Sequence, residues 1–183
     1  MQRLIAFIVA VAWIYSADAC EREARIKERP LHYAWWLKIH FAACDSELFG
    51  IPVRSIHPTW HRASLLREEN VPKSVRSTVS ETKMKFEIAG DFDDDRRPDK
   101  AVVGVYETAT GAGRFLLIVT ESRASIWKPT FLEVYPGDPG FLGLKQNGSK
   151  LELWSCMECG NVSNLVWSRQ AQKYVWLRAP KYD

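Results

Sequence analysis

The chain has 183 residues and a formal net charge of +3. Its basic side chains are scattered among acidic ones rather than gathered in a stripe that could follow a phosphate backbone, so the charge pattern argues against nucleic-acid binding. The length suits one domain with its own core and is short for two.

The N-terminal segment has the layout of a cleavable secretory signal. Arg3 precedes an apolar run from Leu4 to Tyr15, and the small-residue pattern Ala17-Asp18-Ala19 follows. The run is shorter than the roughly 20 residues of a spanning helix, and no later segment is long and apolar enough to cross a bilayer. We expect residues 1–19 to be a signal peptide and the mature protein to be periplasmic or secreted, with no transmembrane span.

Cleavage after Ala19 would make Cys20 the first mature residue, which is where a bacterial lipoprotein carries its acyl chains. A lipid-attachment box resembles Leu-(Ala/Ser)-(Gly/Ala)-Cys, whereas here Asp18 places a charge two residues before the cysteine and Ala17 replaces the large aliphatic residue. Lipidation of Cys20 is the lesser alternative, and it would leave Cys44 unpaired.

The four cysteines are expected to form disulfides, because export places them in an oxidising compartment. We predict the pairs Cys20 with Cys44 and Cys156 with Cys159, since each closes a short loop at low entropic cost. The second pair could instead act in thiol exchange, but strand-like sequence follows Gly160 where a redox motif needs a helix. A zinc site would require two further ligands.

Residues 20–57 form an N-terminal extension whose sequence predicts no definite structure. A charged, helix-compatible stretch ends at Pro30, and the aromatic-rich segment from Leu31 to Ala43 has mixed periodicity. Trp35 and Trp36 are candidate partner contacts, because adjacent side chains usually cannot both face one core and flat rings suit interfaces.

The segment after Pro58 predicts a short amphipathic helix. A proline at the first helical position is followed by Trp60, Ala63 and Leu66, which form an apolar stripe at helical spacing. The pattern ends before Val71-Pro72, and we expect the helix to pack on a sheet.

Beyond Met84 the sequence predicts short strands separated by tight turns. The expected strands are Lys85 to Ile88, Lys100 to Tyr106, Arg114 to Thr120, Ser125 to Glu133, Lys150 to Cys156, Ser163 to Ser168 and Lys173 to Leu177. The dipeptide Asn147-Gly148 is a strong hairpin signal. We expect residues 58–183 to form a mainly β domain of the α+β class, an antiparallel meander or sandwich with a short N-terminal helix packed on it.

An acidic loop at residues 91–99 is the sequence's clearest chemical feature. Asp91, Asp93, Asp95 and Asp99 stand at positions 1, 3, 5 and 9, and Arg97 would supply a backbone carbonyl between the last two. The mutual repulsion of these carboxylates is relieved only by a cation or by protonation. Calcium fits best, because it takes six to eight oxygen ligands at flexible geometry.

These residues resemble the FG-GAP or VCBS repeat of integrin-like β-propellers and exported bacterial proteins, whose loop reads like DFNGDGKPDLAV. The matching residues are Asp91, Phe92, Asp93, Asp95, Pro98, Asp99, Ala101 and Val102. The resemblance implies a β-hairpin that clasps calcium. Asp94 and Arg96 replace the family's glycines, and positive φ there costs on the order of 1 kcal/mol. No second copy of the loop occurs, so a single repeat is expected rather than a propeller.

An alternative to the calcium loop is a metal-free acidic turn neutralised by its own Arg96 and Arg97. For the whole chain we expect a non-catalytic binding module, of recognition or inhibitor type, whose partner is another envelope or extracellular protein. We find no catalytic set in the sequence. Two alternatives stay open, which are an envelope thiol-disulfide enzyme using Cys156 and Cys159, and a glycan-binding domain using exposed tryptophans.

Overall fold

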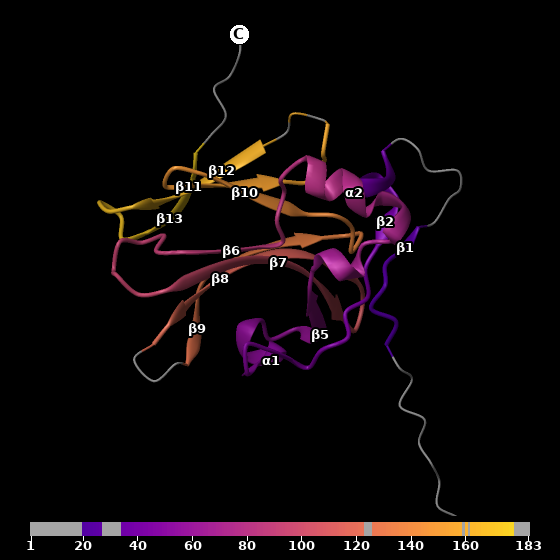
Figure 1. Ribbon diagram of the computed structural model, residues 1–183. Coiled ribbons are helices and arrows are strands. Elements are labelled where there is room, and N and C mark those ends of the chain that lie inside the picture. The colour runs from indigo at the N-terminus through magenta and orange to yellow at the C-terminus, as the bar shows by residue number, and fades with distance from the viewer. Residues whose placement is uncertain (1–19, 27–33, 123–125, 159, 161, 178–183) are drawn as a thin grey trace, which may run out of the picture.

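We describe residues 20–26, 34–122, 126–158, 160 and 162–177 of a computed structural model of the chain (Figure 1). The strands are β1 (Arg25–Ile26), β2 (Ile39–His40), β3 (Glu47–Leu48), β4 (Ile51–Pro52), β5 (Trp60–Leu65), β6 (Glu87–Gly90), β7 (Asp99–Thr108), β8 (Ala112–Glu121), β9 (Trp127–Pro136), β10 (Gly143–Asn147), β11 (Lys150–Trp154), β12 (Val162–Ser168) and β13 (Lys173–Leu177). The helices are α1 (Val53–Ile56) and α2 (Lys73–Glu81), with 3-10 turns η1 (Trp35–Leu37) and η2 (Glu68–Asn70). The predicted signal peptide, residues 1–19, lies outside the described residues.

The long strand β7 organises the larger sheet. Within the described chain, β5, β7, β8 and β9 lie in that order, and β6 pairs with β7 as the fifth strand. Strand β6 pairs with residues 99–102 of β7, and β5 pairs with residues 104–108 of the same edge. Val103, between the two stretches, accepts a hydrogen bond from the Leu66 N–H and donates its own N–H to the Phe86 carbonyl. Two strands thus share one edge end to end.

Strands β10 to β13 form a second antiparallel sheet, a meander in chain order. The predicted hairpin at Asn147-Gly148 is confirmed, because Asn147 pairs with Lys150 at the end of the β10–β11 ladder. Gly148 has a φ of +61°, which the left-handed turn position requires and which glycine adopts without strain. The predicted strands did not include β10, although Leu144 within it is fully buried.

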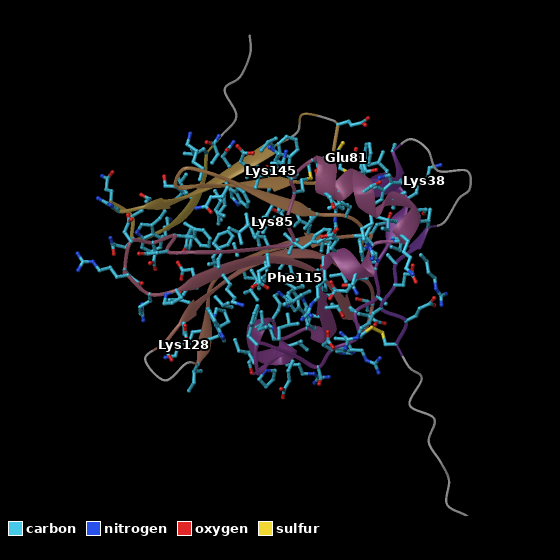
Figure 2. The ribbon with its side chains drawn as sticks, in the orientation of Figure 1. Lys38, Glu81, Lys85, Phe115, Lys128 and Lys145 are labelled. Carbon is cyan, nitrogen blue, oxygen red and sulfur yellow. A yellow bond between two sulfur atoms is a disulfide. The ribbon has the colours of Figure 1, made fainter. Side chains whose placement is uncertain are left out.

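Two apolar cores lie on opposite faces of the larger sheet. Successive β7 side chains alternate between them, so Ala101 and Val103 enter the core shared with the second sheet, while Val102 enters the smaller core beyond. The smaller core is closed by β3, β4 and α1, which Figure 1 shows on the side of the larger sheet away from β10–β13. The side chains in Figure 2 fill the space between the layers. The mainly β fold class predicted from the sequence is therefore confirmed.

The predicted helix after Pro58 is wrong, because Trp60 to Leu65 is strand β5. A bulge shifts the β5–β7 register between Trp60 and Arg62, so Trp60 and Ala63 face the same small core although they are three residues apart. The bulge thus reproduces the spacing of a helical stripe. The helix in this region is α2, which begins at Lys73, just after the point at which the prediction ended.

Trp35 and Trp36 are not surface contacts, and that prediction is wrong. Their side chains are only 2% and 5% exposed and belong to the large core. The two rings lie edge to face with centroids 6.1 Å apart, and Trp35 also packs on Phe141 at 5.7 Å. One 3-10 turn directs both rings into the same core, although adjacent side chains usually cannot both face one core.

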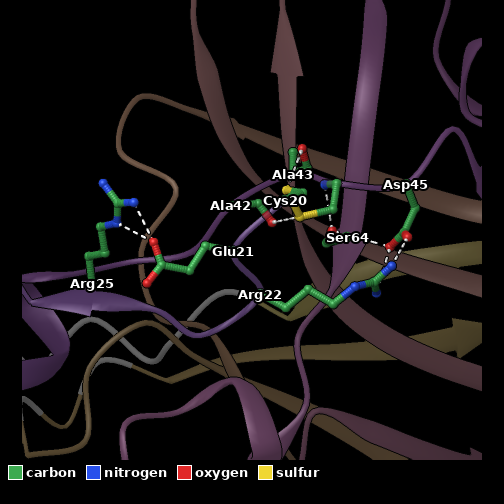
Figure 3. Close-up of a disulfide and its surroundings, with 9 residues drawn as sticks. Cys20, Glu21, Arg22, Arg25, Ala42, Ala43, Asp45 and Ser64 are labelled. Atoms are coloured by element: carbon green, nitrogen blue, oxygen red, sulfur yellow. Dashed lines mark hydrogen bonds and ion pairs between the residues drawn. A yellow bond between two sulfur atoms is a disulfide. The ribbon is translucent and has the colours of Figure 1, made fainter. Parts of the chain in front are cut away.

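A predicted disulfide joins Cys20 to Cys44, 24 residues apart (Figure 3). Beside it, Arg22 Nη2 lies 2.6 Å from Asp45 Oδ1, and the Asp45 backbone pairs with Ala63 on the outer edge of β5. The N-terminal extension is thereby fastened to the larger sheet.

Cys156 is also disulfide-bonded, and its predicted partner Cys159 lies outside the described residues. Cys156 is only 3% exposed and packs in the large core. Across the described part of the chain, none of the helices is long and apolar enough to cross a membrane.

Strand β7 packs closely against β5 and β8 at Gly104, and this packing can be tested by a substitution there. A Cβ atom there would lie 2.2 Å from Phe115 Cζ and 2.5 Å from the Ser64 carbonyl oxygen. We expect Gly104→Ala to lower the free energy of unfolding by about 1–3 kcal/mol, because the ring and the backbone must shift. Gly111→Ala is the matched control, since no heavy atom lies within 4 Å of its Cβ position. Equal urea midpoints for the two variants would contradict this packing.

Candidate functional site

The acidic loop is the turn of the β6–β7 hairpin. Gly90 pairs with Asp99 at the end of the ladder, and residues 91–98 form the turn between them. Figure 1 places this turn beside the turn that joins β12 to β13. The loop therefore lies where the ends of the two sheets meet, although its residues are local in sequence.

Three of the predicted ligands converge. One carboxylate oxygen from each of Asp91, Asp93 and Asp99 lies within 4.8 Å of the others. A calcium ion bound at 2.3–2.6 Å allows two of its oxygen ligands to lie up to about 5 Å apart, so the spacing of each pair is compatible with a shared ion. The donors are all carboxylate oxygens, which favours a hard cation over zinc.

Asp95 and Arg97 contact each other and are not part of this converging group. The Arg97 Nε–H donates to Asp95 Oδ2 at 2.6 Å, and Nη2 donates to the same oxygen. The hydrogen bond from Arg97 is the main reason that the pKa of Asp95 is held below its usual value. The guanidinium therefore already occupies the carboxylate that the predicted calcium shell takes at its fifth position.

Asp99 is fully buried at the start of β7. The Thr120 hydroxyl donates to its Oδ1 at 2.5 Å, and the Phe92 N–H donates to its Oδ2 at 2.8 Å. Burial raises the pKa of Asp99, and the two hydrogen bonds oppose that rise. Burial also raises the pKa of Asp93, to which the neighbouring carboxylates contribute further. The charged cluster is thus unfavourable without a counterion.

The loop backbone is left-handed at the two positions where the resembling family has glycine. Asp94 has a φ of +62° and Arg96 a φ of +67°, each of which costs on the order of 1 kcal/mol for a residue with a side chain. The backbone is held by the Asp91 carboxylate, which accepts the N–H groups of Asp95 at 3.1 Å and Arg96 at 3.0 Å. The loop thus keeps a left-handed backbone at Asp94 and Arg96, although neither residue type favours it.

The arginines of the loop neutralise only part of its charge. Arg97 pairs with Asp95, whereas Arg96 forms no ion pair among the described residues. The predicted metal-free turn therefore accounts for Asp95 but leaves Asp91, Asp93 and Asp99 without an arginine partner in the described structure. The converging carboxylates are thus the ones with no cationic side chain paired to them among the described residues.

Three residues outside the loop complete the site, and sequence reasoning missed them. Besides Thr120, Arg169 in the β12–β13 turn contacts Asp94, with Nη2 and Oδ2 2.7 Å apart. Tyr174 in β13 is 7% exposed, and its hydroxyl has no hydrogen-bond partner among the described residues. Burial raises its pKa, with further contributions from the loop carboxylates, led by Asp99. The second sheet therefore supplies part of the site's surroundings.

Comparisons with protein-family models, with curated proteins and with solved structures gave no match. The likeness to the FG-GAP or VCBS loop therefore rests on the sequence around Asp91–Asp99 alone.

Electrostatics in the loop predict the effect of Asp93→Asn in the presence of a calcium chelator. Because the folded state raises the pKa of Asp93, its ionised form costs stability at neutral pH, and asparagine removes that cost. We expect a gain of less than about 1 kcal/mol, since the side chain is partly exposed.

The size of this stability gain depends on pH. The gain should disappear below the unfolded-state pKa of 3.8, where Asp93 is protonated in both folded and unfolded chains. Urea unfolding at neutral and acidic pH measures it. A loss of stability at neutral pH, or a gain that persists in acid, would contradict the electrostatic account.

Proposed function

We propose that the chain is a secreted or periplasmic, non-catalytic binding module in which a calcium ion stabilises the junction of two sheets. The observation that carries the proposal is the convergence of the Asp91, Asp93 and Asp99 carboxylates within 4.8 Å. Asp91 and Asp93 would hold the ion from the loop, and Asp99 would hold it from the start of β7. The ion would offset the burial and, to a smaller extent, the mutual repulsion that raise the pKa values of Asp93 and Asp99.

A structural role for the ion is supported by the position of the loop. Its Asp94 contacts Arg169 in the β12–β13 turn, and Tyr174 of the same hairpin is buried near the carboxylates. The Asp94–Arg169 pair is exposed and by itself contributes little. A cation that fixes the loop would therefore act on the docking of the second sheet rather than on a reacting substrate.

A protein partner is favoured over a glycan by the burial of the aromatic rings. A sugar-stacking site needs a flat ring open to solvent, but in the described ranges three tryptophans are buried and the other four are half-buried. Export is supported by the leader-like sequence of residues 1–19 and by the Cys20–Cys44 disulfide. A sulfur in that disulfide does not carry a thioether-linked lipid at the same time.

The thiol-disulfide alternative is disfavoured by the place of Cys156. A redox sulfur must meet its substrate, whereas Cys156 is packed in the large core. The double variant Cys156→Ser with Cys159→Ser is expected to lose stability and to retain partner binding. Disulfide reductase activity in the wild type that disappears in this variant would favour the alternative.

Calcium is expected to raise the thermal unfolding midpoint of chelator-treated protein. At a free concentration one hundred times its dissociation constant, a bound ion adds about 2.7 kcal/mol to the free energy of unfolding. Asp93→Asn should remove the calcium-induced shift. Asp94→Asn is the matched control, because it deletes a charge one residue away whose carboxylate pairs with Arg169 instead. Identical shifts in the two variants would place the ion elsewhere.

The binding role is tested by capture of an envelope or extracellular protein from an extract. We expect wild type and Asp94→Asn to retain the same partner in calcium and to release it in chelator. Asp93→Asn should retain less than the wild type in calcium and as little as the wild type in chelator, because the ion that fixes the loop no longer binds. Capture of no specific protein under any of these conditions would contradict a recognition role. The calcium site would still be tested separately by the calcium-induced shift of the thermal unfolding midpoint.

A further inference from the structure

A groove of about 810 Å³ opens in the larger sheet where β5 and β6 part. Both strands pair with the same edge of β7, so the chain must leave that edge after Leu65 and return to it at Phe86. The intervening chain forms η2 and α2, and the groove lies between these elements and the two strand ends. This arrangement follows from the topology and does not involve the acidic loop.

The floor of the groove is apolar. It is lined by Leu65, Val79, Met84, Phe86 and Val102, which come from β5, α2, the segment before β6, and β7. The volume falls within the roughly 300–1,000 Å³ typical of small-molecule sites. The groove therefore has room for the apolar body of a ligand.

The acidic side chains at the rim are already engaged. Glu69 lies 3.7 Å from Arg67, and Glu87 Oε1 lies 2.7 Å from Lys100 Nζ. Glu68 Oε1 accepts a hydrogen bond from the Ser80 hydroxyl at 3.0 Å. Each rim carboxylate thus has a donor from the protein.

Two lysines at the rim have no such partner. Lys83 and Lys85 both line the groove, and in the described part of the chain neither ammonium group forms an ion pair. Both residues are exposed, on the short segment that joins α2 to β6, where Figure 2 labels Lys85. The rim therefore offers two ammonium groups without an ion-pair partner above an apolar floor, against one carboxylate, Glu68, that is hydrogen-bonded but not ion-paired in the described structure.

We propose that this groove binds a single-chain amphipathic anion, with the apolar chain on the floor and the charged head at Lys83 and Lys85. This inference goes beyond the proposed calcium module and does not rest on it. The groove lies at the Glu87 end of β6, whereas the acidic loop follows the Gly90 end. Loss of either site leaves the other testable.

Decanoate and its methyl ester are the probes, because they share one chain and differ in the charge of the head. Each is titrated into the full chain by calorimetry, below the concentration at which it self-associates. We expect one decanoate per chain, and ester binding at least about threefold weaker, as expected when exposed charge pairs are lost.

Two variants assign the binding to the groove. The double variant Lys83→Ala with Lys85→Ala should weaken decanoate binding by about two- to tenfold, and it should then bind decanoate no more tightly than the ester. Ser80→Trp should weaken the binding of both probes, because an indole at this exposed helix position would cover the groove. Ser77→Trp is the matched control, since Ser77 is exposed on α2 and does not line the groove. Circular dichroism checks that each variant is folded.

Several results would overturn the proposal. These are equal affinity for the acid and the ester in the wild type, unchanged binding in Ser80→Trp, and no decanoate binding at all. Sedimentation with phosphatidylglycerol vesicles tests a membrane source of the anion. Vesicle binding without binding of monomeric decanoate would show that a lipid surface, rather than a single-chain anion, occupies the lysines.

Discussion

A carboxylate buried between two sheets is the constraint around which this structure is arranged. Asp99 begins β7, and its side chain shares the face of Ala101 and Val103 that enters the large core. Burial of a charge is costly unless the group is hydrogen-bonded or paired. The Phe92 N–H and the Thr120 hydroxyl meet part of that demand and fix the first turn of the loop to β8. The remaining cost of burying the Asp99 charge would be offset by a cation held between the carboxylates.

The loop keeps a conformation that its own residues do not favour. Asp94 and Arg96 are left-handed without being glycine, and the Asp91 carboxylate gathers the backbone N–H groups around itself. Arg97 of the loop compensates Asp95, and Arg169 of the β12–β13 turn compensates Asp94. Neither pairs with the converging carboxylates of Asp91, Asp93 and Asp99. Strain and uncompensated charge thus occur together, which is the combination that a bound cation would offset.

The sequence predicted those features that depend on local spacing. The alternating aspartates of residues 91–99 implied a shared centre, and three of them meet there. Prediction failed where a bulge or a distant contact decides the outcome. The bulge in β5 gives Trp60 and Ala63 a helix-like spacing on a strand. Arg169 reaches Asp94 from 75 residues along the chain, and no local pattern marks it.

The central claim is that three carboxylates at the sheet junction share one calcium ion. Calorimetric titration of calcium into chelator-treated protein tests it most directly, because it counts ions without depending on unfolding. The account predicts one ion per chain in the wild type and none after Asp91→Asn with Asp93→Asn. A wild type that gives no binding heat, or a double variant that binds calcium as the wild type does, would contradict it.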